Sequence, residues 1–147
     1  MIRPYTPKDK TALINILKQH IPTYFEASEE QDFVNYLDNE IQDYFIVEHN
    51  STIIGSGGIN YFPEEKTARL SWDIIHPDMQ KQGIGRELSQ YRIKLIRSNP
   101  SIDVLVVRTT QLVYPFYQKL GFELQKIEKD YWAKDFDLYQ LQLRVKN

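Results

Sequence analysis

The sequence predicts an α/β protein in which one mixed, mostly antiparallel sheet is flanked by helices on both faces. Segments with the apolar period of helices alternate with short apolar runs typical of strands, in the order β-α-α-β-β-β-α-β-α-β-β. The chain of 147 residues is long enough to bury a core. No internal repeat, low-complexity segment or interdomain linker divides it. We therefore expect a single domain over residues 1–147.

The first third predicts one strand and two helices. The strand covers residues 2–5, and the first helix follows with Thr6 as N-cap and Pro7 at its first position. The second helix begins at Ser28, which is expected to form a capping box with Gln31. Its buried stripe is expected to contain Phe33, Val34, Leu37 and Ile41.

Three strands are expected next, over residues 44–49, 52–62 and 67–76. Asn50 and Ser51 supply a turn between the first two, so the three should form an antiparallel meander.

The second half continues with a long helix after the meander and a continuous apolar strand over 103–107, which should be central in the sheet. A short helix over 115–120 ends at Gly121, a glycine typical of a helix C-terminus. Two strands, 122–128 and 137–143, close the chain.

Composition excludes several classes of protein. The chain has no cysteine, which rules out disulfides, thiolate metal sites and a cysteine thioester mechanism. No run of about 18 apolar residues is present and the first residues lack a signal peptide pattern, so we expect a soluble, cytoplasmic protein without a membrane partner. The net charge of -2 does not suggest nucleic acid.

The charges are nevertheless divided along the chain. Between Lys18 and Lys66 there are ten carboxylates and no basic residue, whereas Met79 to Arg97 holds five basic residues against one acid. The ten are Glu26, Glu29, Glu30, Asp32, Asp38, Glu40, Asp43, Glu48, Glu64 and Glu65. One part of the protein could thus suit a cation, and another part an anion.

A glycine-rich turn in the stretch HPDMQKQGIG precedes the long helix. The N–H groups at a helix start have no partner within the helix, and glycines at 83 and 85 leave those groups accessible and permit positive φ. Lys81 and Arg86 add positive charge. The turn therefore predicts a phosphate site. The turn is not a Walker loop, which requires G-x-x-x-x-G-K-S/T. It is not a dinucleotide fingerprint either, because Leu88 stands where the third glycine of that fingerprint would be.

Two motifs carry a resemblance to a known family. Gln80, Gly83 and Gly85 match Q/R-x-x-G-x-G/A, and PFYQKLGF, about thirty residues later, matches F-Y-x-x-x-G-F. Both motifs and the order of elements resemble the GNAT superfamily of acetyl-CoA-dependent N-acetyltransferases over nearly the whole chain.

The resemblance implies a site for acetyl-CoA. In GNAT proteins the strand before the glycine turn splays from the next strand at a bulge, and the pantetheine arm enters there. Asp73, Ile74 and Ile75 would line the arm, and many members place an asparagine where this chain has Thr110. The residues expected to bind the cofactor are Ile74, Ile75, Lys81, Gln82, Gly83, Ile84, Gly85, Arg86 and Thr110.

The resemblance also assigns catalytic candidates. Tyr117 matches the tyrosine that protonates the departing thiolate, and the alternative is a core tyrosine with a hydrogen-bonded hydroxyl. Asp73 is a candidate base, and the alternative is a carboxylate that pairs with a neighbouring strand or with solvent. His76 has a suitable intrinsic pKa, but a histidine in an H-P-D turn is more often a cap or a surface residue. No metal is expected.

The acceptor is expected to be a cationic amine. The acidic first third, with Tyr24, Phe25 and Tyr36, would form one wall of the acceptor site, and DYWAKDFD would supply Tyr131 or Trp132 to stack on the amine. The alternative is a solvated acidic face.

We therefore expect an acyltransferase that moves an acetyl group from acetyl-CoA to a primary amine of a small molecule or peptide. Homodimer formation stays open. Two alternatives remain: a binding module of the same fold that holds acyl-CoA without chemistry, and a regulatory domain that binds a phosphate ligand through the glycine turn alone.

Overall fold

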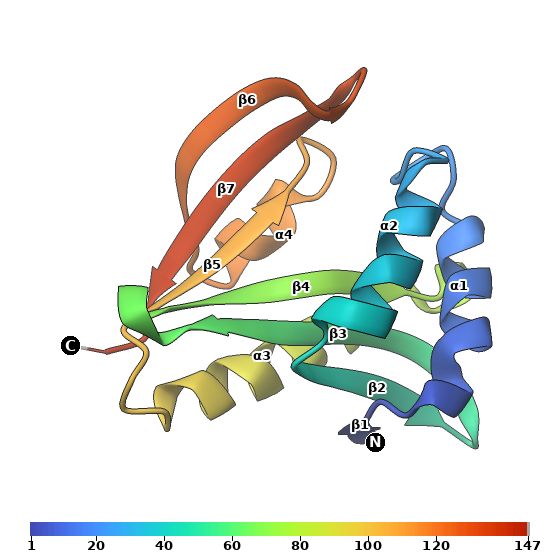
Figure 1. The fold of residues 1–147 in the computed structure, drawn as a ribbon, viewed down its shortest axis with the longest axis horizontal. Helices are drawn as coiled ribbons and strands as arrows, with labels where there is room; N and C mark the ends of the chain where they lie inside the picture. Colours follow the sequence, from blue (N-terminus) through green and yellow to red (C-terminus); the bar gives the residue numbers. More distant parts are fainter. Residues whose placement is uncertain (147) are drawn as a thin grey trace. The chain divides into compact units, whose positions relative to one another are not determined.

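The structure of the protein, a computed structural model, describes residues 1–146 and contains the predicted elements in the predicted order (Figure 1). The strands are β1 (Ile2–Pro4), β2 (Asp43–His49), β3 (Thr52–Phe62), β4 (Thr67–Ile75), β5 (Val104–Thr109), β6 (Glu123–Ala133) and β7 (Phe136–Arg144). The helices are α1 (Lys10–Lys18), α2 (Glu29–Asn35), α3 (Ile84–Arg97) and α4 (Tyr114–Lys119). Short 3-10 turns cover Pro7–Asp9, Pro63–Glu65 and Pro77–Met79, and a π-helical turn covers Tyr36–Glu40. None of the helices in residues 1–146 is long and apolar enough to span a membrane.

The strands form a seven-stranded sheet in the order β1-β2-β3-β4-β5-β7-β6. The β1–β2, β2–β3, β5–β7 and β6–β7 pairs are antiparallel, whereas β4 and β5 run parallel. The apolar strand β5 therefore lies inside the sheet, between β4 and β7, as its sequence predicts. The expected α/β class with a mixed, mostly antiparallel sheet is confirmed.

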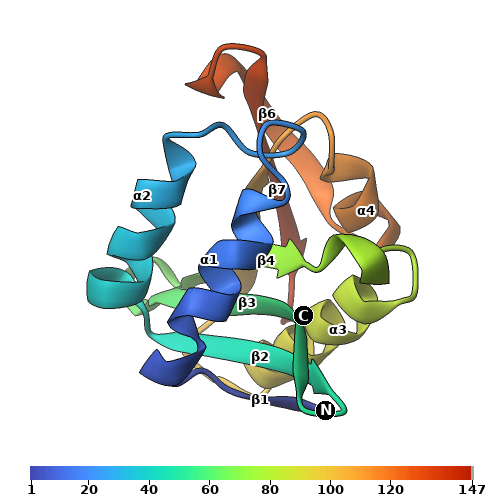
Figure 2. The same cartoon turned by 90° about the vertical axis from the view of Figure 1, so that its right-hand side faces the viewer.

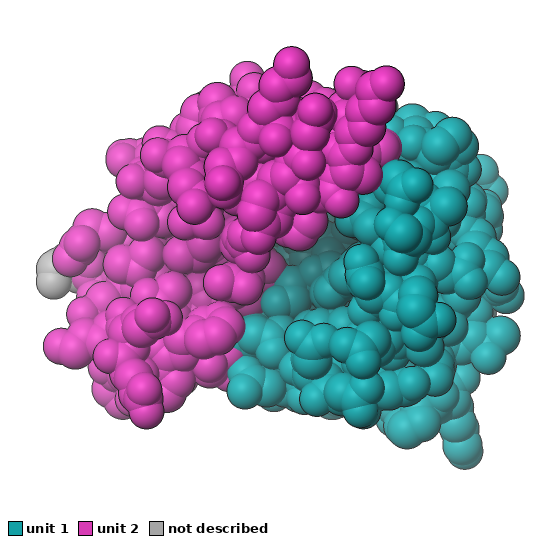
Figure 3. Space-filling model, turned by 45° about the horizontal axis from the view of Figure 1, so that its top comes forward, with its two compact units in different colours: residues 1–60, 71–92 teal, residues 61–70, 93–147 magenta. Residues whose placement is uncertain are grey.

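The chain divides into two compact units, which Figure 3 shows in different colours. Unit 1 contains residues 1–60 and 71–92, and unit 2 contains residues 61–70 and 93–147. Strands β3 and β4 and helix α3 each pass from one unit into the other.

In unit 1, helices cover both faces of the strands (Figure 2). Because side chains alternate along a strand, Tyr44 and Ile46 of β2 face α1 and α2, while the ring of Phe45 contacts Tyr91 of α3. The core against α1 and α2 contains Leu13, Ile16, Leu17, Phe33, Tyr36, Leu37, Tyr44, Ile46 and Ile74. Of the stripe predicted for the second helix, Phe33 and Leu37 are buried, and Val34 and Ile41 are half-buried.

The two helix starts in unit 1 differ in how well the sequence predicts them. The backbone N–H of Thr6 donates to the Asp9 carboxylate over 2.9 Å, which confirms Thr6 as a capping residue. The capping box expected for Ser28 and Gln31 is wrong, because the Ser28 side chain makes no cap hydrogen bond. Instead, the N–H of Glu26 donates to the Glu29 carboxylate over 2.8 Å, so the cap begins two residues earlier.

In unit 2, α4 lies against β7. The buried side chains include Ile102, Leu105, Val107, Phe122, Leu138 and Leu141. Gly121 has φ +102 and follows α4, as expected for the residue after a helix C-terminus. Strand β6 is an edge strand, and its residues 123–131 are all exposed. Strand β6 ends at Ala133 and β7 begins at Phe136. The polar residues 129–136, expected to lie between the two strands, therefore form the hairpin that joins them.

Candidate functional site

The glycine turn lies in unit 1, immediately before α3. Gly83 has φ +83 and its α-carbon faces open space, whereas the N–H of Glu87 already donates to the Gly83 carbonyl oxygen over 3.0 Å. Helix α3 therefore starts at Ile84, and the N–H groups of its first turn have no partner within the helix. Before it, the N–H of Asp78 donates to Nδ1 of His76 over 3.1 Å, so His76 is a cap, as its alternative interpretation held.

The two glycines have different backbone conformations. Positive φ occurs at Gly83 and also at Lys81, which has φ +66, but Gly85 lies inside the first turn of α3 and is helical. The expectation of positive φ at Gly85 is thus wrong, because the helix begins one residue before it. The turn as a whole presents consecutive N–H groups at the positive end of a 14-residue helix, which suits an anion.

The basic residues near the turn divide into exposed and buried ones. Lys81 and Arg86 are exposed, as an anion site requires. Arg92 is 0% exposed and pairs with Asp73, so it adds no accessible positive charge to the turn.

Arg92 forms a buried ion pair with Asp73. Its Nη1 lies 2.6 Å from Oδ1 and its Nη2 lies 2.9 Å from Oδ2 of Asp73, and it also donates to the carbonyl oxygens of Gly58 and Leu88. Gly57 makes room for the pair, because a β-carbon there would lie 2.6 Å from Asp73 Oδ1. Asp73 therefore pairs with a helix, whereas the alternative interpretation held that its partner is a neighbouring strand or solvent. Its role as a base stays a prediction.

Strand β4 changes conformation next to Asp73. Trp72 has φ +50, which is rare for a bulky residue within a strand and marks a local irregularity. The Trp72 carbonyl accepts from the Tyr44 hydroxyl over 2.7 Å, and Nε2 of buried His20 lies 2.6 Å from the Ile75 carbonyl oxygen. The Tyr44 hydroxyl on β2 and the His20 ring after α1 therefore fix the backbone of β4 at Trp72 and at Ile75.

The predicted lining residues of β4 differ in accessibility. Ile74 is 1% exposed and belongs to the core, whereas Ile75 is only half-buried. Backbone groups of this segment thus remain the better candidates for contact with a ligand, in keeping with the pairing that the resemblance implies.

An aromatic group surrounds Trp72 in unit 1. Its ring packs on Phe33, with centroids 5.0 Å apart, and stacks with Phe25 at 6.1 Å. The Tyr36 hydroxyl donates to Asn60 over 2.8 Å, and burial raises the pKa of Tyr36 to about 12. Of the three aromatic residues expected at the acceptor wall, Phe25 and Tyr36 therefore belong to this group.

The acidic first third is partly neutralised within unit 1. Asp38 pairs with Lys10 at 2.8 Å and Glu48 pairs with Arg3 at 3.0 Å. Glu29 is different: burial raises its pKa, and the charges of Asp32 and Glu26 act in the same direction. The carboxylates of Glu26, Glu29 and Asp32 therefore lie near one another at the start of α2.

Tyr117 and Thr110 lie in unit 2. Tyr117, on α4, is 4% exposed, and its ring contacts Phe116 and Phe122 edge to face. The Thr110 hydroxyl accepts from the N–H of Leu112 over 3.2 Å, so it stabilises the turn before α4. The other predicted site residues, on β4 and around the glycine turn, belong to unit 1.

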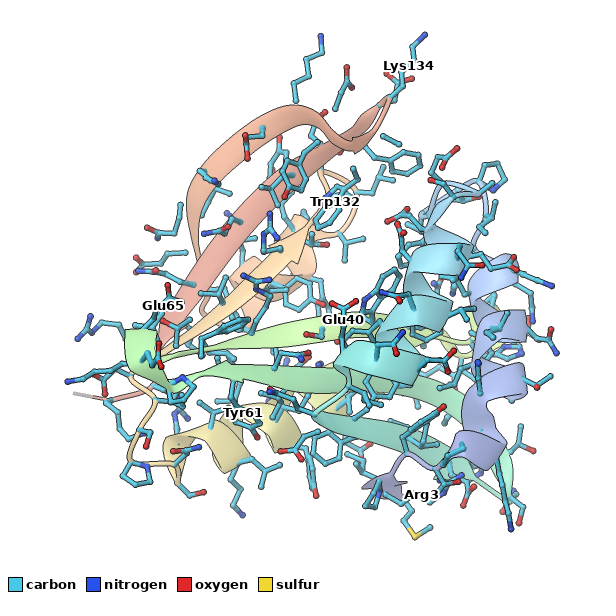
Figure 4. All side chains as sticks on the ribbon, viewed as in Figure 1. Arg3, Glu40, Tyr61, Glu65, Trp132 and Lys134 are labelled. Carbon is cyan, nitrogen blue, oxygen red and sulfur yellow. The ribbon has the colours of Figure 1, made fainter. Side chains whose placement is uncertain are left out.

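Tyr131 and Trp132 already hold a cation of the protein itself. The Arg108 guanidinium lies 5.0 Å from the Tyr131 ring centroid and 5.5 Å from that of Trp132. Trp132, near the end of β6, is labelled in Figure 4. Its Nη2 also donates to the Tyr131 hydroxyl over 2.6 Å. This arrangement does not match the expectation that these rings stack on an incoming amine.

The sequence did not point to Arg92, His20 or Arg108. Arg92 and Arg108 stand in segments whose apolar period gives no reason to single them out, and a lone histidine after a helix carries no pattern. In residues 1–146, no three His, Asp or Glu side chains gather closely enough to hold a metal ion.

Comparison with known proteins bears on these features. A family model described as acetyltransferase (GNAT) domain matches residues 40–124, which include the glycine turn and Tyr117. An amino-acid acetyltransferase of Mannheimia succiniciproducens is 32% identical over 110 residues, which cover 75% of this chain and 24% of the relative. This chain spans about a quarter of the length of that relative.

Two solved structures share the fold. The ribosomal-protein-S18-alanine N-acetyltransferase of Escherichia coli has a TM-score of 0.80 at 20% identity and covers 100% of this chain and 94% of its own. An acetyltransferase of Salmonella typhimurium, solved with its cofactor acetyl-CoA, has a TM-score of 0.74 at 17% identity and covers 100% of this chain and 94% of its own.

Proposed function

We propose, because this chain belongs to the family of GNAT acetyltransferase domains, that it transfers an acetyl group from acetyl-CoA to a primary amine of a small molecule or peptide. The observation that carries the proposal is the turn before α3. Gly83 has φ +83 and open space around it, and the N–H groups that follow lie at the positive end of α3. Open space beside Gly83 and N–H groups at a helix start are what a phosphate ligand requires.

The residues proposed to hold acetyl-CoA follow from this geometry and from the family motif. Lys81 and Arg86 are exposed beside the turn, so they can neutralise phosphate charge, while the backbone from Gln82 to Gly85 donates N–H groups. The backbone at Ile74 and Ile75 is proposed to pair with the pantetheine arm. Thr110 replaces the asparagine of many relatives and is proposed to contact the arm as well.

Acetyl transfer requires a neutral amine to attack the thioester carbonyl and a proton for the thiolate that leaves. We assign the proton to the Tyr117 hydroxyl, following the motif F-Y-x-x-x-G-F. Asp73 is retained as a candidate base, but both of its oxygens accept from Arg92, so a proton would compete with a buried ion pair. Water between the amine and the bulk solvent could serve instead.

The acceptor is proposed to be an amine that is cationic before it reacts, with an amino acid as the first candidate. The name of the Mannheimia relative supports the amino acid. The neighbouring carboxylates of Glu26, Glu29 and Asp32 at the start of α2 support the positive charge, because a group of carboxylates attracts an ammonium group.

We also propose that residues 1–147 act as one acetyltransferase domain, since the match over 40–124 includes parts of both units. A cytoplasmic location fits the proposal, because a fold without cysteine needs no oxidising compartment. The proposed reaction involves no nucleic acid and no membrane, and it leaves homodimer formation open.

The test is release of free thiol from acetyl-CoA in the presence of a panel of amines: free amino acids, a peptide N-terminus, a polyamine and a neutral aryl amine. Acetylation of at least one cationic amine, confirmed by mass spectrometry of the product, would support the proposal. Acetyl-CoA binding without turnover on any amine would favour the binding-module alternative. Binding of phosphate ligands with no preference for acetyl-CoA would favour the regulatory domain.

A further inference from the structure

A histidine that the proposed reaction does not use lies beside β4. His20 follows α1, and its side chain is 5% exposed. Its N–H donates to the Leu17 carbonyl oxygen over 2.9 Å, and its own carbonyl oxygen accepts from the N–H groups of Tyr24 and Phe25 over 2.8 and 3.2 Å. The rings of these two residues also contact the imidazole, with centroids at 5.7 and 6.5 Å. The backbone and the packing therefore hold the imidazole in place.

The hydrogen bond at one ring nitrogen determines which nitrogen carries the proton. Nε2 lies 2.6 Å from the Ile75 carbonyl oxygen, and a carbonyl oxygen can only accept. Nε2 is therefore the donor, and in the neutral ring Nδ1 keeps a lone pair. When Nδ1 takes up a proton, the same carbonyl stabilises the imidazolium through a charge-assisted hydrogen bond.

The second ring nitrogen of His20 lies at an accessible edge of the side chain. Among residues 1–146, Nδ1 has no hydrogen-bond partner. In that part of the chain, no fully buried side-chain nitrogen or oxygen lacks a partner. Nδ1 is therefore reached from outside, although the side chain as a whole is only 5% exposed. A rigid ring with an accessible lone pair has the arrangement of a general base.

His20 contacts β4 on the side that faces away from β3. The N–H of His76 donates to the Ile54 carbonyl oxygen of β3 over 2.8 Å. In an antiparallel pair, the backbone groups of successive residues point alternately toward the partner strand and away from it, so those of Ile75 point away from β3. The pantetheine arm is proposed to pair with the backbone of β4 at Ile75, so His20 lies beside the proposed path of the arm.

The segment after His20 leads to the residues proposed for the acceptor. Phe25 stacks with Trp72, and the carboxylates of Glu26 and Glu29 follow at the start of α2. These residues, His20 and Ile75 all belong to unit 1. The imidazole therefore lies between the strand proposed for the cofactor and the segment proposed for the amine, which is the position that a base for this reaction requires.

We infer that His20 is the general base that accepts the proton of the attacking amine at Nδ1. The inference rests on the proposed function and adds a residue to its chemistry. The neutral amine nitrogen bonds to the thioester carbonyl carbon and becomes positively charged, Nδ1 takes up a proton from that nitrogen, and the C–S bond breaks with its electron pair on sulfur. The thiolate receives its own proton separately, as proposed above, and the imidazolium returns its proton to solvent. Asp73, the other candidate, has both oxygens engaged by Arg92.

His20→Gln distinguishes a base from a residue that only positions β4. The glutamine amide nitrogen can replace Nε2 as the donor to Ile75, but the amide cannot take up the proton. With an amine that the wild-type chain acetylates, we expect kcat to fall by about 100-fold. The affinity for acetyl-CoA, measured by calorimetry, should stay unchanged.

Chemical rescue gives a second measurement. His20→Ala removes the ring, and added imidazole should restore part of its rate as the imidazole concentration rises. Neither the wild-type chain nor the matched control His49→Gln, at the exposed end of β2, should respond to imidazole. Full activity of His20→Gln, together with a loss in His20→Ala that imidazole does not restore, would mean that His20 only positions β4, and it would overturn the inference.

A measurement on the wild-type chain covers the case in which the variants do not fold, which thermal unfolding reveals. NMR with isotope-labelled histidine at neutral pH should show the proton of the neutral His20 ring on Nε2 and none on Nδ1. A neutral ring with its proton on Nδ1 would overturn the inference.

The results also separate the inference from the proposed function. If the wild-type chain acetylates an amine and His20→Gln keeps its kcat, only the inference is wrong. If the wild-type chain acetylates no amine, the proposed function fails and the inference fails with it.

Discussion

Asp73→Asn should destabilise the protein strongly. The substitution keeps the shape of the side chain but removes the negative charge opposite Arg92, whose side chain is 0% exposed. In the wild-type protein, Nη1 of Arg92 lies 2.6 Å from Oδ1 and Nη2 lies 2.9 Å from Oδ2 of Asp73. In the variant, the amide oxygen can still accept from Nη1, but the amide nitrogen would face Nη2, and both groups are donors.

The magnitude follows from what Arg92 keeps. Loss of one partner of a fully buried ion pair costs about 3–5 kcal/mol. Arg92 retains its hydrogen bonds to the carbonyl oxygens of Gly58 and Leu88, and the Asp73 side chain is 20% exposed, so water can replace part of the lost contact. We therefore expect a loss of about 2–3 kcal/mol in the free energy of unfolding. In a chain of 147 residues this corresponds to a Tm lower by about 5–10 °C.

Chemical denaturation and thermal unfolding measure the effect. Asp32→Asn is the control, since Asp32 is exposed and should change the free energy of unfolding by about 1 kcal/mol or less. Arg92→Met alone should also destabilise, but the double variant Asp73→Asn, Arg92→Met should lose less than the sum of the two single changes. A free energy of unfolding for Asp73→Asn within about 0.5 kcal/mol of wild type would refute the reasoning.

Three further outcomes are expected. Gly83→Ala should weaken acetyl-CoA binding by about tenfold and lower the free energy of unfolding by about 1–2 kcal/mol, because residue 83 has a φ of +83. Gly85→Ala should weaken binding with little loss of stability. Calorimetry that shows unchanged affinity in both folded variants would contradict the phosphate site. Tyr117→Phe should lower kcat by about 100-fold at nearly constant acetyl-CoA affinity, and full activity in steady-state assays would mean that another group protonates the thiolate. Glu29→Gln should raise Tm at pH 8, because the folded state disfavours the charged carboxylate whose pKa burial raises. That gain should shrink as pH falls toward the ordinary value of 4.5, where wild-type Glu29 is protonated in the folded state, and a gain that is constant with pH would argue against this cause.

The parts of the fold that depend on local pattern could be predicted from the sequence. The order of elements followed from apolar periodicity, and Gly121 marked the end of α4 because a left-handed residue is needed there. The start of α3 at the glycine turn followed from local chemistry in the same way. The hairpin after β6 was missed because its residues are polar, although hydrogen bonds such as that from the N–H of Asp135 to Asp130 hold it.

The parts that depend on tertiary pairing could not be predicted. Asp73 and Arg92 are 19 residues apart, and neither residue indicates that the other is its partner. Trp72 adopts φ +50 although a bulky aromatic residue is among the least favoured there, so its conformation is imposed by the surrounding structure. The face to which Arg108 points became known only when its strand partners were known.

Strand β6 has a consequence for the behaviour of the protein in concentrated solution. It is an edge strand, so its outer row of N–H and C=O groups is a template on which another polypeptide could add, and Ile127 is 50% exposed along it. The same stretch carries Lys126, Glu128 and Lys129, whose charges oppose continuous pairing with a second apolar strand. These charges disfavour fibril-like assembly through β6. Added salt screens the charges, so it should increase association of the protein through this edge.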